Sequence, residues 1–448
     1  MTTSRTRRTP DLHAAVTEAD VRRVALRAHL ADRRVRLPLR YWRQQAHFTT
    51  PAEETMARKA VEGGTAPMAR ILDRIGVSPN QLADHLGADV ALVEALLARP
   101  RRAPLVMLDA EDALAPTEDA ARRGLEAATR VLTTADWSGG GQSSLRFFRP
   151  PGLNLDTTAR ELYGLLWALA AETLEGSPLP LDGIVFPKIE QPEEVELVHA
   201  MLTSAEEALG LPIGGIRVAY LVESGWAAAR LPEIALRAAD RLCALVFGLA
   251  DYSADLGLPS IANEHPLADW ARATIVDVAG AIGVPAIDGM TLDYPVADPA
   301  LDGAANRRRF LDRMDLVYRD AVRARDFGMT GKWVGHPAQL FAVLLAYEAG
   351  LQPAALEAEA AKLAAYSLAV DQQGKGATII AGVMSDRATD RHARAVLRQA
   401  TALGRFDAGR AFSLGIIDEA DLVEASGVAG DTLRRHAVDR AGGERTRQ

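Results

Sequence analysis

The segment Ile216–Pro259 reads IRVAYLVESGWAAARLPEIALRAADRLCALVFGLADYSADLGLP and contains two short apolar runs separated by one amphipathic helical stretch. The runs are Ile216–Val222 and Ala244–Gly248; Glu223 follows the first, and Asp251 lies just past the second. A strand, helix, strand unit with so short a connection makes the two strands parallel neighbours. Both carboxylates are therefore predicted at the same C-terminal edge of one sheet, which is where α/β folds bind ligands.

Two neighbouring carboxylates suit a hard divalent cation. Mg²⁺ prefers oxygen ligands and keeps several waters, so two protein donors are enough when water and substrate complete its shell. Mn²⁺ accepts the same ligands, whereas zinc would need His or Cys nearby. Glu223 and Asp251 are therefore predicted metal ligands. The alternative is that Glu223 is a carboxylate favoured at a helix N-terminus and Asp251 caps the helix that follows.

The composition of the chain limits its class of function. With 448 residues and a net charge of −8, it is long enough for a large core and too acidic for a constitutive nucleic-acid or anionic-membrane binder. No apolar run reaches the ~18 residues of a membrane span, and the N-terminal MTTSRTRRTP lacks the apolar core of a signal peptide. The single cysteine, Cys243, excludes an intramolecular disulfide framework and is expected to be buried. We expect a soluble, cytoplasmic protein whose partners are small molecules, not nucleic acid or membrane.

From Pro104 onward, short apolar strands alternate with helical stretches, and polar residues follow each strand. Counting a weaker strand near Phe48, the sequence predicts eight strands: Tyr41–Thr50, Leu105–Leu108, Ser144–Phe148, Gly183–Phe186, Ile216–Val222, Ala244–Gly248, Ala286–Ile287 and Lys332–Val334. Eight strands alternating with helices indicate an α/β protein with a (β/α)₈ TIM barrel. The polar residues then gather at a single mouth.

Three parts are expected along the chain. Residues 1–45 are predicted to form an N-terminal basic and helical extension. Residues 46–350 are predicted to form the TIM-barrel catalytic domain, with a helical insertion at residues 52–102. Residues 351–448 lie outside the barrel count and are predicted to form a C-terminal helical lid or oligomerisation segment.

The helical insertion raises an alternative function. Ser78–Gly87 followed by Asp89–Leu97 indicates a helix, a glycine turn and a second helix, which is also how a DNA-binding helix-turn-helix begins. A regulator that senses a ligand in its barrel is therefore one alternative for the protein. Two packed helices that cover one end of the barrel are the preferred interpretation, because the chain is acidic and this segment lacks a basic recognition face.

Six motifs, in their order and spacing, resemble the HpcH/HpaI aldolase and citrate lyase β-subunit-like (CitE-like) family, which includes the malyl-CoA lyases. They are LDAEDALAP (Leu108–Pro116), LRFFRPPG (Leu145–Gly152), FPKIEQPEEV (Phe186–Val195), LVESGWA (Leu221–Ala227), VFGLADYSADLG (Val246–Gly257) and GKWVGHPAQL (Gly331–Leu340). The FTTPAEE segment also resembles the CitE-type malate synthases of the same superfamily. The resemblance implies a TIM-barrel enzyme that makes or breaks a carbon–carbon bond beside a CoA thioester.

The resemblance also implies roles for particular residues. Glu223 and Asp251 stand where the family binds Mg²⁺, and Arg146 stands where it holds the substrate's carboxylate or oxyanion. Asp386, in MSDRATDRHAR, stands where the family's C-terminal segment supplies a catalytic carboxylate to a neighbouring subunit. This implies a homo-oligomer, either a trimer or a hexamer. The alternative for Asp386 is a plain helix cap.

Other polar residues are expected to bind substrate or to support Arg146. Lys188, Asp109 and Glu111 are predicted substrate-binding residues. Asp109 and Glu111, together with Asp112, are expected to hydrogen-bond Arg146 or water on the metal. An ion pair with the nearby Glu190 is expected to keep Lys188 charged.

Two alternatives concern the catalytic chemistry. A lysine Schiff base is the other way to run an aldolase, and Lys188 and Lys332 are its candidates. His336 is a candidate general base, although HPAQ at the start of a helix is more typical of a capped turn.

The predicted function is a Mg²⁺-dependent carbon–carbon lyase. It would cleave or form a 3-hydroxyacyl-CoA, such as malyl-CoA or citramalyl-CoA, with acetyl-CoA and a 2-oxo acid as the other side of the reaction. The metal would polarise an oxygen, an arginine would neutralise developing charge and a carboxylate would move the proton. One alternative is malate synthase-like condensation followed by thioester hydrolysis. The other is a class II pyruvate-type aldolase that does not use CoA.

Overall fold

The structure is a computed structural model that describes residues 12–31, 35–114, 117–138, 143–373, 376–380 and 382–426. The N-terminal polar tail, the end of the LDAEDALAP motif, part of the loop after residue 373 and the tail from residue 427 lie outside the described residues. Every residue predicted above for the site lies within them.

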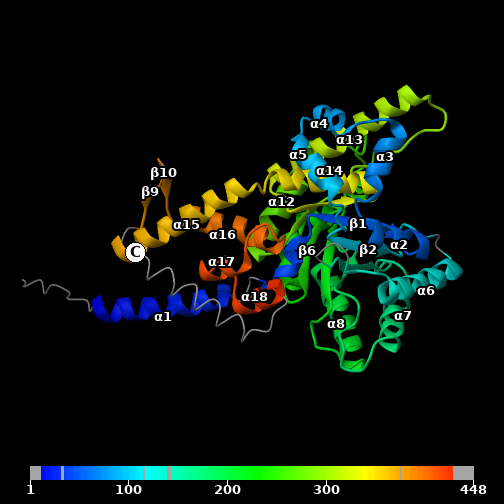
Figure 1. Ribbon diagram of the computed structural model, residues 1–448. Helices are drawn as coiled ribbons and strands as arrows, with labels where there is room; N and C mark the ends of the chain where they lie inside the picture. Colours follow the sequence, from blue (N-terminus) through cyan, green and yellow to red (C-terminus); the bar gives the residue numbers. More distant parts are fainter. Residues whose placement is uncertain are drawn as a thin grey trace, which may run out of the picture.

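Eight parallel strands close into a barrel in chain order, with the last strand paired to the first (Figure 1). The TIM-barrel prediction is therefore confirmed. The strands are β1 (Ala46–Pro51), β2 (Leu105–Asp109), β3 (Leu145–Arg149), β4 (Gly183–Phe186), β5 (Arg217–Val222), β6 (Leu242–Phe247), β7 (Ala286–Asp288) and β8 (Gly331–Val334). The largest difference from prediction is at β1, because Leu39–Arg43 form a short 3-10 helix, η1, before that strand.

The strands are buried on both faces. Met107, Phe147 and Leu221 belong to the apolar cluster that fills the barrel, whereas their neighbours Leu108 and Phe148 pack in the layer between strands and helices. Successive side chains of a strand point to opposite faces, so both layers need apolar residues. This explains the near-continuous apolar runs. Cys243 is buried in the interior cluster, as predicted.

Helices return the chain from the mouth to the start of the next strand. They are α6 (Glu118–Thr134), α7 (Thr158–Ala171), α8 (Pro192–Ala208), α9 (Gly225–Ala229), α10 (Leu231–Ala238), α11 (Leu249–Asp255), α12 (Pro266–Ile282), α13 (Gly303–Phe327) and α14 (Pro337–Ala349). Several begin with proline, among them α8, α12 and α14. Proline suits the first turn, where its missing N–H would have no partner in the helix.

The insertion forms four short helices: α2 (Glu54–Gly63), α3 (Pro67–Ile75), α4 (Pro79–Leu86) and α5 (Val90–Ala98). A capping box of Ser78 and Gln81 starts α4, and Gly87 ends it with a left-handed φ of 60°. Helix α4 packs on α13 and α5 packs on α14. Both helices therefore pack on the outer helices of the barrel.

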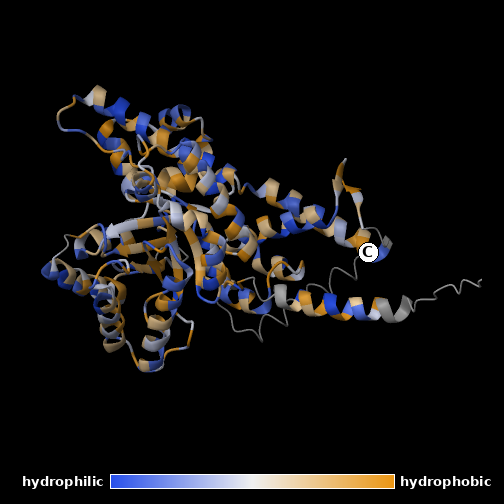
Figure 2. Cartoon of the chain, turned by 180° about the vertical axis from the view of Figure 1, so that it is seen from behind, coloured by the Kyte–Doolittle hydropathy of each residue, from blue (hydrophilic) through white to orange (hydrophobic). Residues whose placement is uncertain are grey.

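The C-terminal segment extends away from the barrel. It consists of α15 (Pro353–Gln373), β9 (Thr378–Ile380), β10 (Val383–Ser385), α16 (Arg387–Ala402), α17 (Ala408–Ser413) and α18 (Glu419–Ser426). Its own apolar cluster joins α15 to α16–α18 and includes Leu39 of η1. Figure 1 shows the β9–β10 hairpin at the outer end of α15, and Figure 2 shows apolar residues on that hairpin.

The N-terminal helix α1 (Leu12–Ala31) is exposed along its described side chains. Within the described ranges, no helix combines the length and apolar character that crossing a bilayer would require.

Candidate active site

The mouth of the barrel brings together charged side chains from the ends of β2, β3, β5 and β6. Asp109 and Arg149 are the last residues of β2 and β3 and lie side by side in register. Glu223 directly follows β5, and Asp251 lies in the first turn of α11 after β6. These positions agree with the prediction that Glu223 and Asp251 share one edge.

Arg146 is not at this mouth, so the predicted position of the substrate arginine is wrong. Its backbone N–H donates to Asp182 Oδ2 at 2.9 Å, and Asp182 lies just before β4. Its guanidinium carbon lies 5.5 Å from the centre of the Trp137 ring. Arg146 is the second residue of β3 and Arg149 is its last, so the strand carries Arg146 at the N-terminal face and Arg149 at the opposite one.

Arg149 is the arginine that the predicted acidic residues surround. Its Nε and Nη2 donate to the two carboxylate oxygens of Asp109 at 2.8 and 2.6 Å. Glu111 and Asp112 lie 3.1 and 3.2 Å from its guanidinium nitrogens, and the Trp333 ring centre lies 5.5 Å from its guanidinium carbon. Burial alone would lower the pKa of Arg149, but hydrogen bonds and charge from Asp109 raise it above its usual value. Arg149 is thus held charged in a fixed orientation.

Lys188 links the two halves of the mouth. It has a φ of 54°, which makes it the one non-glycine residue with positive φ in the part of the chain described. Such a conformation costs on the order of 1 kcal/mol and is retained where neighbours require it. Here it directs the backbone N–H of Lys188 to Glu223 Oε1 at 2.6 Å and its Nζ to Glu111 Oε1 at 2.7 Å. The predicted pairing with Glu190 is wrong, because Glu111 is the partner.

Glu223 is buried, and the charge of a second carboxylate, Asp251, acts on it. Burial, followed by the charge of Asp251, raises its pKa to about 7. A side chain at Gly248 would not fit, since a Cβ there would lie 2.5 Å from the Glu223 Cβ and 2.9 Å from its Oε2. Gly248 therefore leaves the space in which Glu223 turns toward the mouth.

The donor set fits a hard divalent cation. Five carboxylates and two cationic side chains meet at this mouth, so negative charge is in excess (Asp109, Glu111, Asp112, Glu223 and Asp251 with Arg149 and Lys188). A cation between Glu223 and Asp251 would relieve the repulsion that raises the Glu223 pKa. Among the described residues, no group of three or more His, Cys, Asp or Glu forms a metal cage. Water and substrate would have to supply the remaining ligands.

Comparison with known proteins identifies the family. A family model described as HpcH/HpaI aldolase/citrate lyase matches residues 98–310, a range that contains all seven of these mouth residues. The L-malyl-CoA/β-methylmalyl-CoA lyase of Cereibacter sphaeroides is 30% identical over 331 residues, which cover 70% of this chain and 92% of that protein. The chain belongs to the HpcH/HpaI aldolase/citrate lyase family. The predicted family is confirmed.

Two more distant similarities were found, one in sequence and one in structure. A malate synthase of Oryza sativa subsp. japonica is 26% identical over 390 residues, which cover 77% of this chain and 66% of that protein. The crystal structure of a citrate lyase from Burkholderia xenovorans superposes with a TM-score of 0.54 at 22% identity, covering 83% of this chain and 95% of that one. The structural match supports the fold. Family membership confirms the prediction of a carbon–carbon lyase.

Two residues considered for catalysis in this lyase have structural partners instead. His336 caps α14, where its Nδ1 accepts from the Ala338 N–H at 3.2 Å, as the capped-turn alternative expects. Burial lowers the pKa of His336. Lys332 is fully buried, with its Nζ 2.7 Å from Asp288 Oδ2 and 2.8 Å from Asp320 Oδ2. Lys332 therefore belongs to a buried ion-pair network and not to the mouth.

Asp386 lies outside the mouth of its own barrel. It is the N-cap of α16, where one carboxylate oxygen accepts from the N–H groups of Ala388 and Thr389 at 2.8 and 3.1 Å. These hydrogen bonds, that from Thr389 first, lower the pKa of the exposed carboxyl group. Asp386 directly follows β10 of the outlying hairpin in Figure 1. Asp386 therefore caps α16, as the alternative expects. It could act in a barrel mouth only if that barrel belonged to another subunit.

We expect no lysine Schiff base in this lyase. Burial would lower the pKa of Lys188, but its hydrogen bond to Glu111 raises the pKa overall, so the neutral amine that attacks a carbonyl is scarce. Treatment with pyruvate and sodium borohydride should therefore leave the intact mass of the protein unchanged. A known lysine-dependent aldolase treated in parallel serves as the positive control. A mass increase located at Lys188 or Lys332 would contradict this expectation.

Proposed function

We propose that this lyase uses Mg²⁺, or Mn²⁺ in its place, to cleave or form a 3-hydroxyacyl-CoA such as malyl-CoA or citramalyl-CoA. The observation that carries the proposal is the pair Glu223 and Asp251, which interact electrostatically at the mouth near the fixed cation of Arg149. The relative named L-malyl-CoA/β-methylmalyl-CoA lyase supports this substrate class.

Carbon–carbon cleavage produces two fragments, a 2-oxo acid and a CoA thioester, and each needs its own binding groups. Cleavage breaks the bond between C2 and C3 of the acyl chain: the hydroxyl at C3 loses its proton and becomes the carbonyl of a 2-oxo acid, and the thioester fragment leaves as an enolate that gains a proton. Mg²⁺, when bound, would act as a Lewis acid on the oxygen that becomes this carbonyl. Arg149 would hold the carboxylate of the 2-oxo acid, because its planar guanidinium is fixed by Asp109 and Glu111.

Lys188 and Glu111 would support catalysis by fixing the positions of other side chains at the mouth. The Lys188 N–H fixes one oxygen of Glu223, and Glu111 accepts from the Lys188 side chain while it contacts Arg149. One strained residue thus connects the proposed metal ligand to the proposed substrate arginine. The predicted substrate-binding role of Lys188, Asp109 and Glu111 is kept here as positioning of these two groups.

A groove beside the mouth is suited to a CoA thioester. This cavity, of about 1420 Å³, starts at Thr49 and Gly335 near the ends of β1 and β8 and continues along α2 and α6. Its walls carry Lys59, Arg70 and Arg123, which suit the phosphates of CoA. Gly335 is needed here, because a Cβ at that position would lie 2.2 Å from the Tyr294 hydroxyl oxygen.

We also propose that Asp386 of a neighbouring subunit completes the site and exchanges the proton at the carbon that becomes the acetyl-CoA methyl group. The hairpin before Asp386 exposes Ile379, Val383 and Met384, which are 74%, 59% and 63% accessible in the single chain. Apolar exposure of this kind favours burial against another surface. A second copy of the chain, in a trimer or hexamer, is the proposed occupant.

Complementation tests this arrangement. Arg149→Ala and Asp386→Ala subunits should each be inactive, but co-expressed subunits should regain up to about one quarter of the wild-type activity, because random mixing in a symmetric oligomer pairs an intact barrel with an intact neighbouring arm in that fraction of sites. Mixing Arg149→Ala with Glu223→Gln is the control, since both defects lie in the same barrel and no rescue is expected. An Asp386→Ala variant with normal turnover would exclude the proposal.

Mass spectrometry of a substrate panel tests the function itself. The protein with Mg²⁺ is incubated with malyl-CoA, citramalyl-CoA and, in the reverse direction, acetyl-CoA with 2-oxo acids. Release of a 2-oxo acid with acetyl-CoA supports the lyase. Free CoA together with a free hydroxy acid would indicate the hydrolytic reaction of a malate synthase, which the Oryza relative favours. Turnover of CoA-free 4-hydroxy-2-oxo acids alone would indicate a pyruvate-type aldolase.

A further inference from the structure

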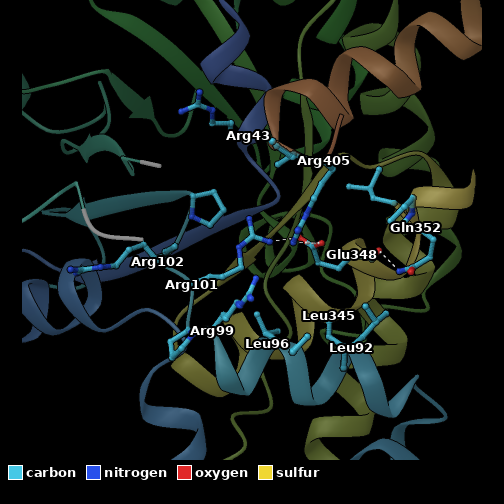
Figure 3. A pocket seen from close by; sticks show the side chains of 18 of the residues that line it. Arg43, Leu92, Leu96, Arg99, Arg101, Arg102, Leu345, Glu348, Gln352 and Arg405 are labelled. Carbon is cyan, nitrogen blue, oxygen red and sulfur yellow. Dashed lines mark hydrogen bonds and ion pairs between the residues drawn. The ribbon is translucent and has the colours of Figure 1, made fainter. Parts of the chain in front are cut away.

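A second cavity lies at the opposite end of the barrel from the mouth. It has a volume of about 710 Å³ and is bordered by Arg43, Pro104 and Ser143, which precede β1, β2 and β3. Its other walls come from α5 of the insertion, from the end of α14 and from the loop Leu403–Arg405 after α16. Three separate parts of the chain therefore meet around one space (Figure 3).

The charges that line this cavity are strongly unbalanced. Of the described residues, five arginines border it (Arg43, Arg99, Arg101, Arg102 and Arg405) and one carboxylate does, Glu348. Glu348 is shared, since one of its oxygens pairs with Arg101 and the other lies 2.5 Å from Arg405. Arg102 pairs with Asp136 at 3.1 Å. In a chain with a net charge of −8, this concentration of positive charge is local and not a property of the whole surface.

Two of the arginines have no carboxylate partner within ion-pair distance among the described residues. Arg43 donates its Nε to the Ala402 carbonyl at 2.9 Å, and burial lowers the pKa of its guanidinium. The exposed side chain of Arg99 forms no hydrogen bond or ion pair with the described residues, and Figure 3 shows it extending toward the same space as Arg101 and Glu348. Arg43 is half-buried, and the charge of Glu424 acts on its guanidinium only from beyond ion-pair distance. A half-buried guanidinium without a direct carboxylate partner favours an added anion.

Most of the remaining lining is apolar, apart from Ser143 and Gln352. Leu92 and Leu96 of α5 face Leu345 of α14 across the lower part of the cavity, and Leu351 lies near its edge. The volume is in the range of ~300–1,000 Å³ that is typical of small-molecule sites, which combine apolar walls with a few well-placed polar groups. A purely inorganic anion would make no apolar contact with these leucines, whereas an organic phosphate would.

We propose that this cavity binds a nucleotide-sized organic phosphate, with its phosphates on Arg43, Arg99 and Arg101 and its ring against Leu92 and Leu96. The planar guanidinium matches phosphate oxygens in pairs. Because the cavity lies at the N-terminal face, the ligand regulates or stabilises the enzyme and takes no part in the chemistry at the mouth. It bridges the barrel to the segment that carries Asp386. The proposal does not depend on the substrate assigned above.

Calorimetric titration of the full-length protein with adenosine 5′-diphosphate tests this proposal, with pyrophosphate and adenosine as component probes. The wild type should bind the diphosphate, and pyrophosphate more weakly. Arg99→Gln and Arg43→Gln should each weaken binding by about tenfold or more, the effect of losing a charge-assisted hydrogen bond. Affinity should also fall with added salt, since the contacts are ionic.

Two matched controls locate the binding. Arg74→Gln removes an exposed arginine of α3 outside the cavity, and Lys59→Gln removes a cation from the groove beside the mouth. Arg74→Gln should leave the affinity unchanged. Lys59→Gln should affect only a second binding event in the groove proposed for CoA phosphates, and not the binding event that Arg43→Gln and Arg99→Gln weaken. No binding by the wild type at millimolar probe would overturn the proposal, as would equal binding by Arg99→Gln and Arg43→Gln or a loss confined to Lys59→Gln. Circular dichroism checks that each variant is folded; Arg99 is exposed, so its replacement should not affect folding.

Discussion

Replacing Arg149 by lysine is expected to lower kcat/KM at least ~10²-fold, which is the range for removing one preorganised donor from a developing negative charge. Lysine keeps the charge but loses the planar fork that Asp109 holds through two hydrogen bonds, at 2.8 and 2.6 Å. The ammonium group would turn toward one of the surrounding carboxylates and leave the substrate carboxylate without its partner.

Arg146→Lys is the matched control, because it makes the same change three residues earlier on the same strand. Arg146 lies over Trp137 at the far end of the barrel, so its replacement should leave kcat/KM close to the wild-type value. Steady-state kinetics on the two variants separate the assignments. A severe loss in Arg146→Lys with normal activity in Arg149→Lys would return the substrate role to Arg146.

Glu223→Gln is expected to have opposite effects on activity and stability. Activity should fall by more than the ~10–100-fold that is typical when only an outer partner of a metal ligand is lost, because Glu223 is proposed as one of two protein ligands. The metal-free protein, however, should become more stable at pH 8. Glutamine still accepts the Lys188 N–H and carries no charge against Asp251.

The stability effect depends on pH in a defined direction. The pKa of Glu223 is about 7 in the folded protein, above the ordinary value of 4.5. Below pH 4.5 the carboxyl is protonated in both states and contributes nothing. Between pH 4.5 and 7 the unfolded chain ionises first, so the folded state loses stability, and above pH 7 the loss is complete at roughly 3 kcal/mol.

Thermal unfolding in EDTA measures this effect. At pH 8 the unfolding midpoint of Glu223→Gln should exceed that of the wild type, and the difference should shrink as the pH falls toward 5. Glu94→Gln, at an exposed position in the middle of α5, should show no such difference. A metal-free Glu223→Gln protein less stable than the wild type at pH 8 would show that the carboxylate is stabilised by its surroundings and not strained.

The sequence predicted the barrel and one edge of its site well, because both depend on local patterns. Apolar runs of strand length, each followed by polar residues, place Glu223 and Asp251 at the same edge whatever the detailed packing is. Arg146 and Arg149 were harder to distinguish. Only the observed end of β3 at Arg149 decides which of the two reaches the mouth, and strand ends are not well defined by apolar pattern alone.

The remaining features depend on contacts between distant segments. The left-handed φ of Lys188, and its pairing with Glu111 instead of Glu190, follow from how the residues after β2, β4 and β5 come together at the mouth. The arginine-lined cavity unites residues near positions 43, 100, 348 and 405. No spacing in the sequence relates these positions, so only the folded chain reveals them.

A crystal structure of the protein soaked with Mn²⁺ and a 2-oxo acid tests the central claim most directly. The anomalous signal of Mn²⁺ should lie between Glu223 and Asp251, about 2.0–2.3 Å from an oxygen of each carboxylate. The carboxylate of the 2-oxo acid should face the guanidinium of Arg149. A Mn²⁺ ion bound elsewhere, or a 2-oxo acid bound away from Arg149, would contradict the assignment of this mouth as the active site.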